Sequence, residues 1–587
     1  MSRILTCAVC LLTAASAFAA EPPAPVGVRI ADFALPDAVG GKDWKLSEAT
    51  RDAKATVIVF INPSCPVSIA YAPRFALLQK KYADKGVAFA LIDSHPTDTA
   101  VEMATHAKDF GIPFPILNDD GTKIADRFNV ERAPTAYVLD AGKTVRYKGR
   151  IDDQHAPMAS RPKPTTSELT DAIAAVLAGK EVTTPYAAAV GCKLTREHKP
   201  VAGGSAVTYH QHVSRILQAK CQDCHRPGEP APFSLLTFKQ AKGWADTIRE
   251  TVANDAMPPW HADAPRGHFL NDRRLDDDQK KTLLAWVDQG CAEGDPKDAP
   301  PAKTYVDGWR LTSKPDMIFA MEKSIDVPAQ YLYGLAGGMP YQYVPAGEKF
   351  KEDAWIQEVE IRPGFRSAIH HVIAYVVPPS KTFFDVAGPD FGKYMLCAYV
   401  PGDDAIIFPA GMAKKVPKGS QILFEMHYTP NGKPGRDQSV IGLVLSKEPP
   451  KYVSMSDAIF NEKFSIPPGD ANHAVTARRT FAEEVMLTAL TPHMHLRGKL
   501  FKYELLDGET GKVETLLSVP KYDFNWQVAY VLAKPRRIPA KSAITCTALY
   551  DNSDKNPVNP NPKNKVRWGE QTWEEMMIGF VEYYVPR

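Results

Sequence analysis

The sequence predicts a multidomain protein with one α/β domain, one small all-α domain and two all-β sandwich domains. Three observations predict this order. Near the N-terminus, continuous apolar, β-branched runs alternate with helical patterns. Helical periodicity then flanks a C-x-x-C-H segment, and the second half has short alternating runs punctuated by proline and glycine. The chain of 587 residues is too long for one core, and its length alone suggests about four domains.

The composition narrows the class of protein. A hydrophobic content of 44% and a charged content of 24% are typical of an ordered globular protein. A formal net charge of +2 gives no reason to expect nucleic acid as a partner. Arg3 precedes an apolar run at 4–18, and Ala17-Phe18-Ala19 has the small-x-small pattern of a cleavage site. We therefore predict a signal peptide at 1–19 and a periplasmic or secreted mature protein without a membrane span.

The first domain is predicted at 20–190. The run 56–61 has the composition of a buried parallel strand, and Cys65 follows it at the start of a helical pattern. Further strands are predicted at 87–92 and 135–139. This order, with a cysteine at the strand-to-helix turn, resembles the thioredoxin-like redoxin family. Ala133-Pro134-Thr135 is similar to that family's cis-proline loop, so the resemblance implies that the loop lies beside Cys65.

Two positions depart from the redoxin pattern. Ser68 stands where dithiol oxidoreductases have the second cysteine of C-x-x-C, and Asn62 stands where the peroxidase version has threonine. Cys65 at a helix N-terminus is still expected to have a lowered pKa. Cys192, outside the module, is the candidate disulfide partner. The alternative is a retained fold that serves only as a docking domain.

A haem domain is predicted at 205–297. Cys221-Gln222-Asp223-Cys224-His225 is the attachment motif of c-type haem, in which two thiols bond the porphyrin and the histidine ligates iron. A closing helix is predicted at 275–290, as in a cytochrome c-like domain. Met257, in a proline-rich loop, is the favoured second axial ligand, and His261 is its rival. The alternatives for the motif are a zinc site and a structural disulfide.

The two sandwiches are predicted at 305–447 and 448–587, and each contains a histidine cluster. The first cluster is His370, His371 and His427. Adjacent histidines on a regular strand face opposite ways, so sharing one metal requires a bulge or a bend at His370. The second cluster is His493 and His495, which face the same side of a strand, with Met576 downstream. Imidazoles with a thioether favour copper over zinc.

These two sets, in this order, resemble the type II copper, ascorbate-dependent monooxygenases, which hydroxylate peptidylglycine or dopamine. Asp551-Asn552-Ser553, Trp568-Gly569 and Glu575 add to the likeness. The resemblance implies that the first set holds an electron-transfer copper. It implies that His493, His495 and Met576 hold a catalytic copper where O2 reacts. It further implies two separate sandwiches with a solvated cleft between the two coppers.

Departures within this region bear on the substrate. Peptide-amidating members carry an arginine two residues before H-x-H, where Thr491 stands, and a tyrosine four residues after the methionine, where Phe580 stands. A peptidylglycine substrate is therefore not expected, and a less polar small molecule is. Cys291, Cys397 and Cys546 have no predicted role, and both burial as free thiols and pairing stay open.

Together these features predict an exported copper monooxygenase with two copper ions and one haem c. Its partners would be a small-molecule substrate, O2 and a periplasmic electron donor. The haem would supply electrons in place of, or beside, ascorbate or another one-electron donor. One alternative is a copper-binding or electron-carrying protein without turnover. A second alternative is a thiol-disulfide redox protein.

Overall fold

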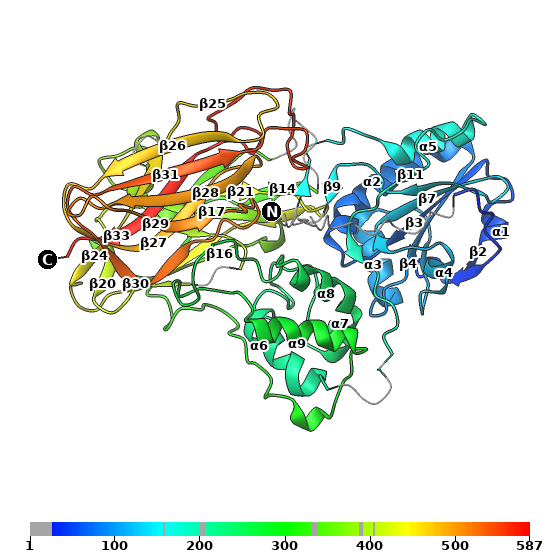
Figure 1. Ribbon diagram of the computed structural model, residues 1–587, viewed down its shortest axis with the longest axis horizontal. Coiled ribbons are helices and arrows are strands. Elements are labelled where there is room, and N and C mark those ends of the chain that lie inside the picture. Colours follow the sequence, from blue (N-terminus) through cyan, green and yellow to red (C-terminus); the bar gives the residue numbers. More distant parts are fainter. Residues whose placement is uncertain are drawn as a thin grey trace, which may run out of the picture.

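A computed structural model describes residues 26–156, 159–161, 163–199, 201, 206–329, 339–386, 391–402 and 405–586. The predicted signal peptide at 1–19 lies outside these residues. Figure 1 shows an α/β region, a helical region and a β-rich region, in blue, green and yellow-to-red respectively. In the described part of the chain, no helix is both long enough and apolar enough to cross a membrane.

The α/β region is built on a six-stranded sheet in the order β11-β8-β7-β3-β4-β5. Its strands are β3 (Ala55–Ile61), β4 (Val87–Asp93), β5 (Ile116–Asn118), β7 (Thr135–Asp140), β8 (Val145–Gly149) and β11 (Tyr186–Ala187). β3, β4 and β5 are parallel, whereas β7 is antiparallel to β3. Every residue of β3 is buried, as its continuous apolar sequence predicts.

Helices cover both faces of this sheet. Those on one face are α2 (Pro66–Tyr82), α3 (Ala100–Phe110) and α5 (Glu168–Leu177), and those on the other are α1 (Leu46–Ala49) and α4 (Lys123–Arg127). The remaining short elements are β1 (Ala34–Pro36), β2 (Asp43–Lys45), a 3-10 turn (Ala83–Lys85), β6 (Arg132–Ala133), β9 (His155–Ala156), β10 (Ala159–Ser160) and β12 (Cys192–Lys193).

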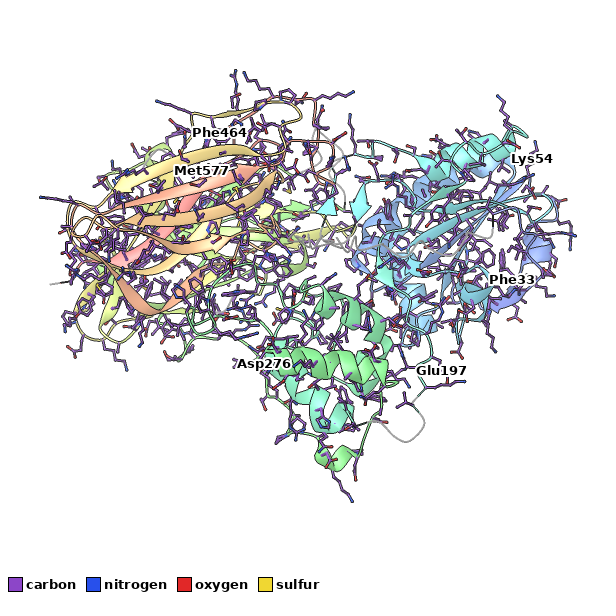
Figure 2. All side chains as sticks on the ribbon, viewed as in Figure 1. Phe33, Lys54, Glu197, Asp276, Phe464 and Met577 are labelled. Atoms are coloured by element: carbon purple, nitrogen blue, oxygen red, sulfur yellow. The ribbon has the colours of Figure 1, made fainter. Side chains whose placement is uncertain are left out.

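The helical region packs around the indole of Trp286, which is fully buried. Its elements are a π-helical turn (Tyr209–Val213), α6 (Ser214–Lys220), α7 (Phe238–Gly243), α8 (Ala245–Ala253), α9 (Asp277–Asp288) and a 3-10 turn (Pro296–Asp298). α9 corresponds to the helix predicted at 275–290. Asp276, labelled in Figure 2, starts it with a capping box that pairs Asp276 with Gln279.

The β-rich region differs from the predicted pair of separate sandwiches, because one nine-stranded sheet runs through both halves. β20 pairs in parallel with β24 and joins the halves across the predicted junction at 447–448. The nine strands are β13 (Met317–Ala320), β16 (Ala354–Arg362), β19 (Ile406–Ile407), β20 (Met412–Val416), β23 (Val440–Leu445), β24 (Tyr452–Phe460), β27 (Val485–His493), β30 (Tyr530–Ile538) and β33 (Ile578–Tyr584).

A four-stranded sheet packs against each half of this shared sheet and encloses a separate apolar core. The first is β15 (Gln342–Lys349), β17 (Ile369–Val377), β18 (Met395–Tyr399) and β21 (Gln421–Tyr428), and the second is β26 (His473–Thr480), β28 (Gly498–Leu506), β29 (Val513–Val519) and β31 (Ala543–Tyr550). The short elements are β14 (Ile325–Val327), β22 (Gly435–Asp437), β25 (Ser465–Ile466), β32 (Val566–Arg567), α10 (Phe383–Val386), α11 (Phe391–Tyr394) and a 3-10 turn (Arg366–Ala368).

A buried lysine joins the two halves at the shared sheet. Lys414 on β20 donates to the carbonyl of Leu396 on β18 at 2.9 Å and to the hydroxyl of Ser456 on β24 at 2.6 Å. Its Nζ also lies 3.2 Å from a carboxylate oxygen of Glu582 on β33. A buried ammonium group must be paired in this way, because an unpaired one is costly.

Replacing Lys414 by alanine is expected to lower the free energy of unfolding of the β-rich region by about 3 kcal/mol, because Glu582 and two further acceptors lose their partner. Lys415→Ala is the matched control, since Lys415 pairs with Asp353 at the exposed surface. That control is expected to change stability by less than about 0.5 kcal/mol. Denaturant unfolding followed by tryptophan fluorescence measures both, and equal losses would contradict the assignment.

Candidate functional site

The first histidine set lies where the start of β17 pairs with the end of β21. His371 pairs directly with His427 across the two strands, and the register shifts between Ile369 and His371. This is the irregularity that the sequence predicted, and it lets His370 join its neighbour on one side. Ligand nitrogens of the three histidines lie within 4.8 Å of one another. The arrangement can offer three imidazoles to one metal ion.

The second set lies at the end of β27. The rings of His493 and His495 are 5.2 Å apart. Nδ1 of His493 is 2.5 Å from the side-chain oxygen of Gln527, and Nδ1 of His495 is 3.2 Å from the carbonyl of Glu574. Because these acceptors take the Nδ1 protons, each histidine has its Nε2 left for a metal.

Met576, the predicted third ligand of this set, is half-buried just before β33. Its carbonyl accepts a hydrogen bond of 2.6 Å from the Tyr550 hydroxyl. Its neighbour Met577 and the intervening Met494 are both fully buried in the core of the second half. Of these three methionines, Met576 alone lies outside that core.

The carboxylate of Glu575 fixes the turn that carries the second set. It accepts the backbone N–H of His495 at 2.9 Å and that of Arg497 at 2.7 Å. The guanidinium of Arg497 lies 3.7 Å from the same carboxylate and donates to the side-chain oxygen of Asn552 at 2.9 Å. Burial raises the pKa of Glu575 to about 7, against the lowering effect of Arg497. From the sequence, Glu575 is noted only as part of a motif, and no role is predicted for Arg497.

The two histidine sets adjoin each other, so the predicted solvated cleft between them is wrong for this structure. The rings of His371 and His493 are 6.1 Å apart, and the ring of Phe524 stacks on His370 at 4.3 Å. The shared sheet and the loop that carries Phe524 and Gln527 bring the two strand ends together and exclude water. His371, His427, His493 and His495 are all buried, and Nε2 of the half-buried His370 is buried too.

These imidazoles suit a metal because they are neutral and short of partners. Burial lowers the pKa of His370 to about 3 and that of His493 to about 4. Nε2 of His370, Nδ1 of His427 and Nε2 of His495 are buried without a hydrogen-bond partner among the described residues. Unsatisfied buried nitrogens are costly, and a bound cation would satisfy them.

The C-x-x-C-H segment follows α6. Cys221 and Cys224 are free thiols, and Nδ1 of His225 lies 3.1 Å from the carbonyl of Phe233. Donation of the Nδ1 proton to that carbonyl leaves Nε2 for a metal, which is the usual second contact of a ligating histidine. Burial lowers the pKa of His225 to about 4, so the ring is neutral. These residues fit a covalently attached haem.

The two candidates for the second axial position of the haem iron lie in different surroundings. Met257 is half-buried in the loop that follows α8. His261 contacts Tyr530 of the β-rich region, and its neighbour Trp260 packs into the core of the second half. His261 therefore lies on the side of the loop that meets the β-rich region.

The structure brings Cys65 and Cys192 together. Cys65 caps the N-terminus of α2, and its sulfur lies 3.3 Å from the carbonyl of Ala133. β12 runs antiparallel to β6 and places Cys192 opposite Ala133, next to the cis peptide bond that the sequence predicted before Pro134. Burial raises the pKa of Cys65, but hydrogen bonds from the Cys192 thiol and from backbone N–H groups outweigh it and lower the value to about 7.

Three other cysteines, Cys291, Cys397 and Cys546, are buried free thiols in their respective cores. Burial raises the pKa of Cys291 and of Cys397 to about 12. These thiols therefore ionise less readily than the equally buried thiol of Cys65.

In the reduced protein, alkylation of Cys65 by iodoacetamide is expected to rise with pH around a midpoint near 7, because the thiolate is the reacting form. Cys192→Ala removes the thiol that stabilises this thiolate, so the midpoint is expected to move upwards. Cys192→Ser keeps a donor and should hold it low. Mass spectrometry of the Cys65 peptide measures the rate, and a wild-type midpoint near the ordinary value of 9.0 would contradict the geometry.

Comparison with known proteins finds relatives of the α/β region. Residues 26–148 match the model of the AhpC/TSA family. Over 129 residues the chain is 29% identical to the thiol-disulfide oxidoreductase ResA of Bacillus cereus, covering 22% of this chain and 72% of ResA. ResA of Bacillus anthracis matches with the same identity and coverage.

Among solved structures, a hypothetical protein, SMc02350, from Sinorhizobium meliloti 1021 has 30% sequence identity and a TM-score of 0.27, covering 30% of this chain and 96% of its own. A secreted Mycobacterium tuberculosis disulfide oxidoreductase has 20% identity and a TM-score of 0.20, covering 25% of this chain and 95% of its own. The family match and the ResA relatives both fall on the α/β region. The N-terminal region of this multidomain chain is a thioredoxin-like redoxin domain of the AhpC/TSA family.

Proposed function

We propose that this protein is an exported oxidoreductase that joins copper-dependent oxygen chemistry in its β-rich region to a thiol pair in its redoxin domain. The observation that carries the copper proposal is the convergence of five histidines from three strand ends. Three of their buried nitrogens lack a hydrogen-bond partner within the described ranges of the chain. The triad of His370, His371 and His427 contains only imidazoles, whereas Mg²⁺ and Ca²⁺ usually take carboxylate ligands.

In this proposal His370, His371 and His427 hold one copper, and His493, His495 and Met576 hold the other. Bound copper would supply O2 activation and hydroxylation of a substrate C–H bond, as in the monooxygenases that the sequence resembles. The protein's own part is to orient and to exclude water. Gln527 and Glu574 set the ring positions of the second set, and Phe524 covers the first.

The pairing of two strand residues supports a substrate of low polarity. Thr491 on β27 lies directly opposite Phe580 on β33, so both departures from the peptide-amidating pattern occur at one place. The ring of Phe580 is 6.5 Å from that of His493 and 5.7 Å from that of Phe391. An uncharged, aromatic wall beside the second set favours an apolar group over a carboxylate.

The haem proposal rests on Cys221, Cys224 and His225. Met257 is the favoured second axial ligand because the His261 backbone contacts Tyr530 and the His261 ring is near the charges of Asp523 and Lys521, all in the β-rich region. A haem c would supply single electrons, which copper oxygen chemistry requires. The competing proposal is a copper and haem protein that carries electrons without turnover.

Metal analysis of the purified protein is expected to give two coppers and one haem per chain, and zinc in their place would contradict the proposal. Met576→Leu is expected to lower ascorbate-supported O2 consumption at least about tenfold while His370, His371 and His427 keep their copper. Met577→Leu, a volume-conserving change of the adjacent core methionine, is the control. Unchanged O2 consumption in the Met576 variant would favour the electron carrier.

A second function, thiol-disulfide exchange, is favoured by the contact of Cys65 with Cys192 and by the ResA relatives. The Cys65 thiolate would attack an external disulfide, release one thiolate and form a mixed disulfide. Cys192, as its thiolate, would then attack the Cys65 sulfur and release the second thiolate. Two electrons pass to the external disulfide, whose two thiols take up the protons, and a Cys65–Cys192 disulfide forms.

Oxidised glutathione is expected to convert the reduced protein to a form with a Cys65–Cys192 disulfide, seen as a linked peptide after blocking with N-ethylmaleimide and digestion. Cys192→Ser cannot complete the second step and should accumulate a glutathione adduct on Cys65. Failure to find the linked peptide in the wild type would rule out this exchange.

A further inference from the structure

One carboxylate ties the C-x-x-C-H loop to the first half of the β-rich region. Glu229 lies four residues after His225, and its side chain is 10% exposed. Three guanidinium groups contact it: Arg226 at 2.8 Å, Arg310 at 2.9 Å and Arg366 at 2.7 Å. Arg226 belongs to the same loop, whereas Arg310 and Arg366 belong to the following region.

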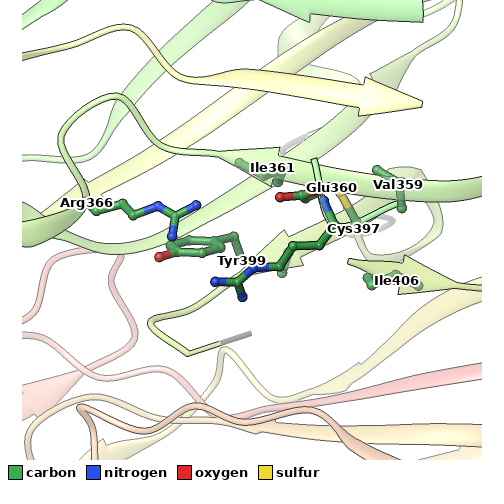
Figure 3. A pocket seen from close by; sticks show the side chains of 9 residues that line it. Val359, Glu360, Ile361, Arg366, Cys397, Tyr399 and Ile406 are labelled. Atoms are coloured by element: carbon green, nitrogen blue, oxygen red, sulfur yellow. Dashed lines mark hydrogen bonds between the residues drawn. The ribbon is translucent and has the colours of Figure 1, made fainter. Parts of the chain in front are cut away.

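One partner of Glu229, Arg366, lies close in sequence to the first histidine set. Arg366 lies in the 3-10 turn that precedes β17, four residues before His370. Figure 3 shows Arg366 beside Tyr399 and Glu360, in a pocket that Arg310 also lines. Glu360 accepts the backbone N–H of Arg310 at 2.5 Å and so holds the segment that carries this second arginine. A short, ordered path of side chains therefore connects the loop after the haem motif to the strand with His370 and His371.

A second contact brings a haem-attachment thiol to the same surface. A Cβ on Gly402, which follows β18, would lie 3.2 Å from the sulfur of Cys224 and 3.1 Å from a guanidinium nitrogen of Arg273. Arg273 donates to the Gly402 carbonyl at 2.7 Å. Gly402 has a φ of +89° and no side chain, so the loop can approach Cys224 closely. β18 pairs with β17, so this contact lies just beyond the strand next to the one that carries His370 and His371.

We propose that this interface is the electron entry of the copper centre: Glu229 docks the haem loop on Arg310 and Arg366, beside the strand that carries the first histidine set, and that set receives single electrons from the haem. The inference rests on the proposed copper and haem function. With haem bound at Cys221, Cys224 and His225 and copper held by His370, His371 and His427, each transfer would oxidise one Fe(II) to Fe(III) and reduce one Cu(II) to Cu(I). An external one-electron donor, ascorbate in the experiment below, reduces the haem again.

The charge pattern favours a role in orientation over one in general adhesion. A largely buried carboxylate with several guanidinium partners gains little stability over apolar contacts, because its desolvation offsets the attraction. It does fix orientation and register strongly, since a displaced loop would leave buried charges without partners. A further contact of the helical region with the β-rich region, between residues 263–271 and the strands around Val531, is made by backbone groups, the neutral side-chain amide of Asn271 and apolar rings.

Glu229→Gln and Arg366→Gln test the interface in the full chain. Both are expected to make amide hydrogen exchange in the loop around 221–229 at least about tenfold faster, because removing one partner leaves a buried charge unpaired and lets the loop open more often. In protein loaded with haem and copper, both are also expected to slow the reoxidation of reduced haem by O2 at least about tenfold. Arg366→Lys, which keeps the charge, is expected to recover part of both losses.

Lys433→Gln is the matched control, because Lys433 forms an ion pair between regions too, at 2.7 Å from Asp109 of the redoxin domain. It should leave haem reoxidation unchanged. If the Glu229 and Arg366 variants, fully loaded with copper and haem, reoxidise haem at the wild-type rate, the electron-entry inference is wrong. The 263–271 contact would then be the next interface to test. Wild-type protein that takes up no copper or no haem would instead refute the proposed function.

Discussion

The arrangement of the second histidine set depends on the buried carboxylate of Glu575. Two backbone N–H groups, those of His495 and Arg497, end on it, and so does the charge of Arg497. Without this acceptor, buried donors at the turn would have no partner, and each would cost free energy. Because Glu575 immediately precedes Met576, the same contact holds the H-x-H turn beside the third predicted ligand. One side chain thus assembles a site from segments about 80 residues apart.

Burial determines the charge of the two histidine sets, and the continuous sheet joins the two halves that carry them. Burial keeps the imidazoles neutral, so their nitrogens are available to a metal at any moderately acidic or neutral pH. The parallel pairing of β20 with β24, supported by Lys414, makes the two halves one layer. The second set lies at the end of β27 in this layer, and the first set lies on the four-stranded sheet that packs against it, so the spacing between the sets does not depend on a hinge between independent domains.

Features carried by short motifs could be predicted from the sequence. Adjacent histidines require a break in strand register, and the register shift occurs at His370. A cysteine after a buried strand and an isolated Ala-Pro-Thr are local patterns, and the structure places both as predicted. The shared sheet, the contact of the two histidine sets and the Glu229 cluster could not be predicted. They join residues far apart in the chain, and nothing in the pattern around β20 or Glu229 specifies a partner.

The helical region is the part of the chain that contacts both the redoxin domain and the β-rich region. Its Glu250 pairs with Arg132 beside Cys192, and Cys192 itself packs against both the redoxin core and the helical core. Its Glu229 pairs with Arg366 in the turn that precedes the first histidine set, and its 263–271 loop lies along β30 of the second half. Thiol exchange moves electrons in pairs, whereas copper and haem take them singly. In the proposed function, a region that contacts both neighbours would hold the thiol pair and the histidine sets in a fixed order while it keeps the two chemistries apart.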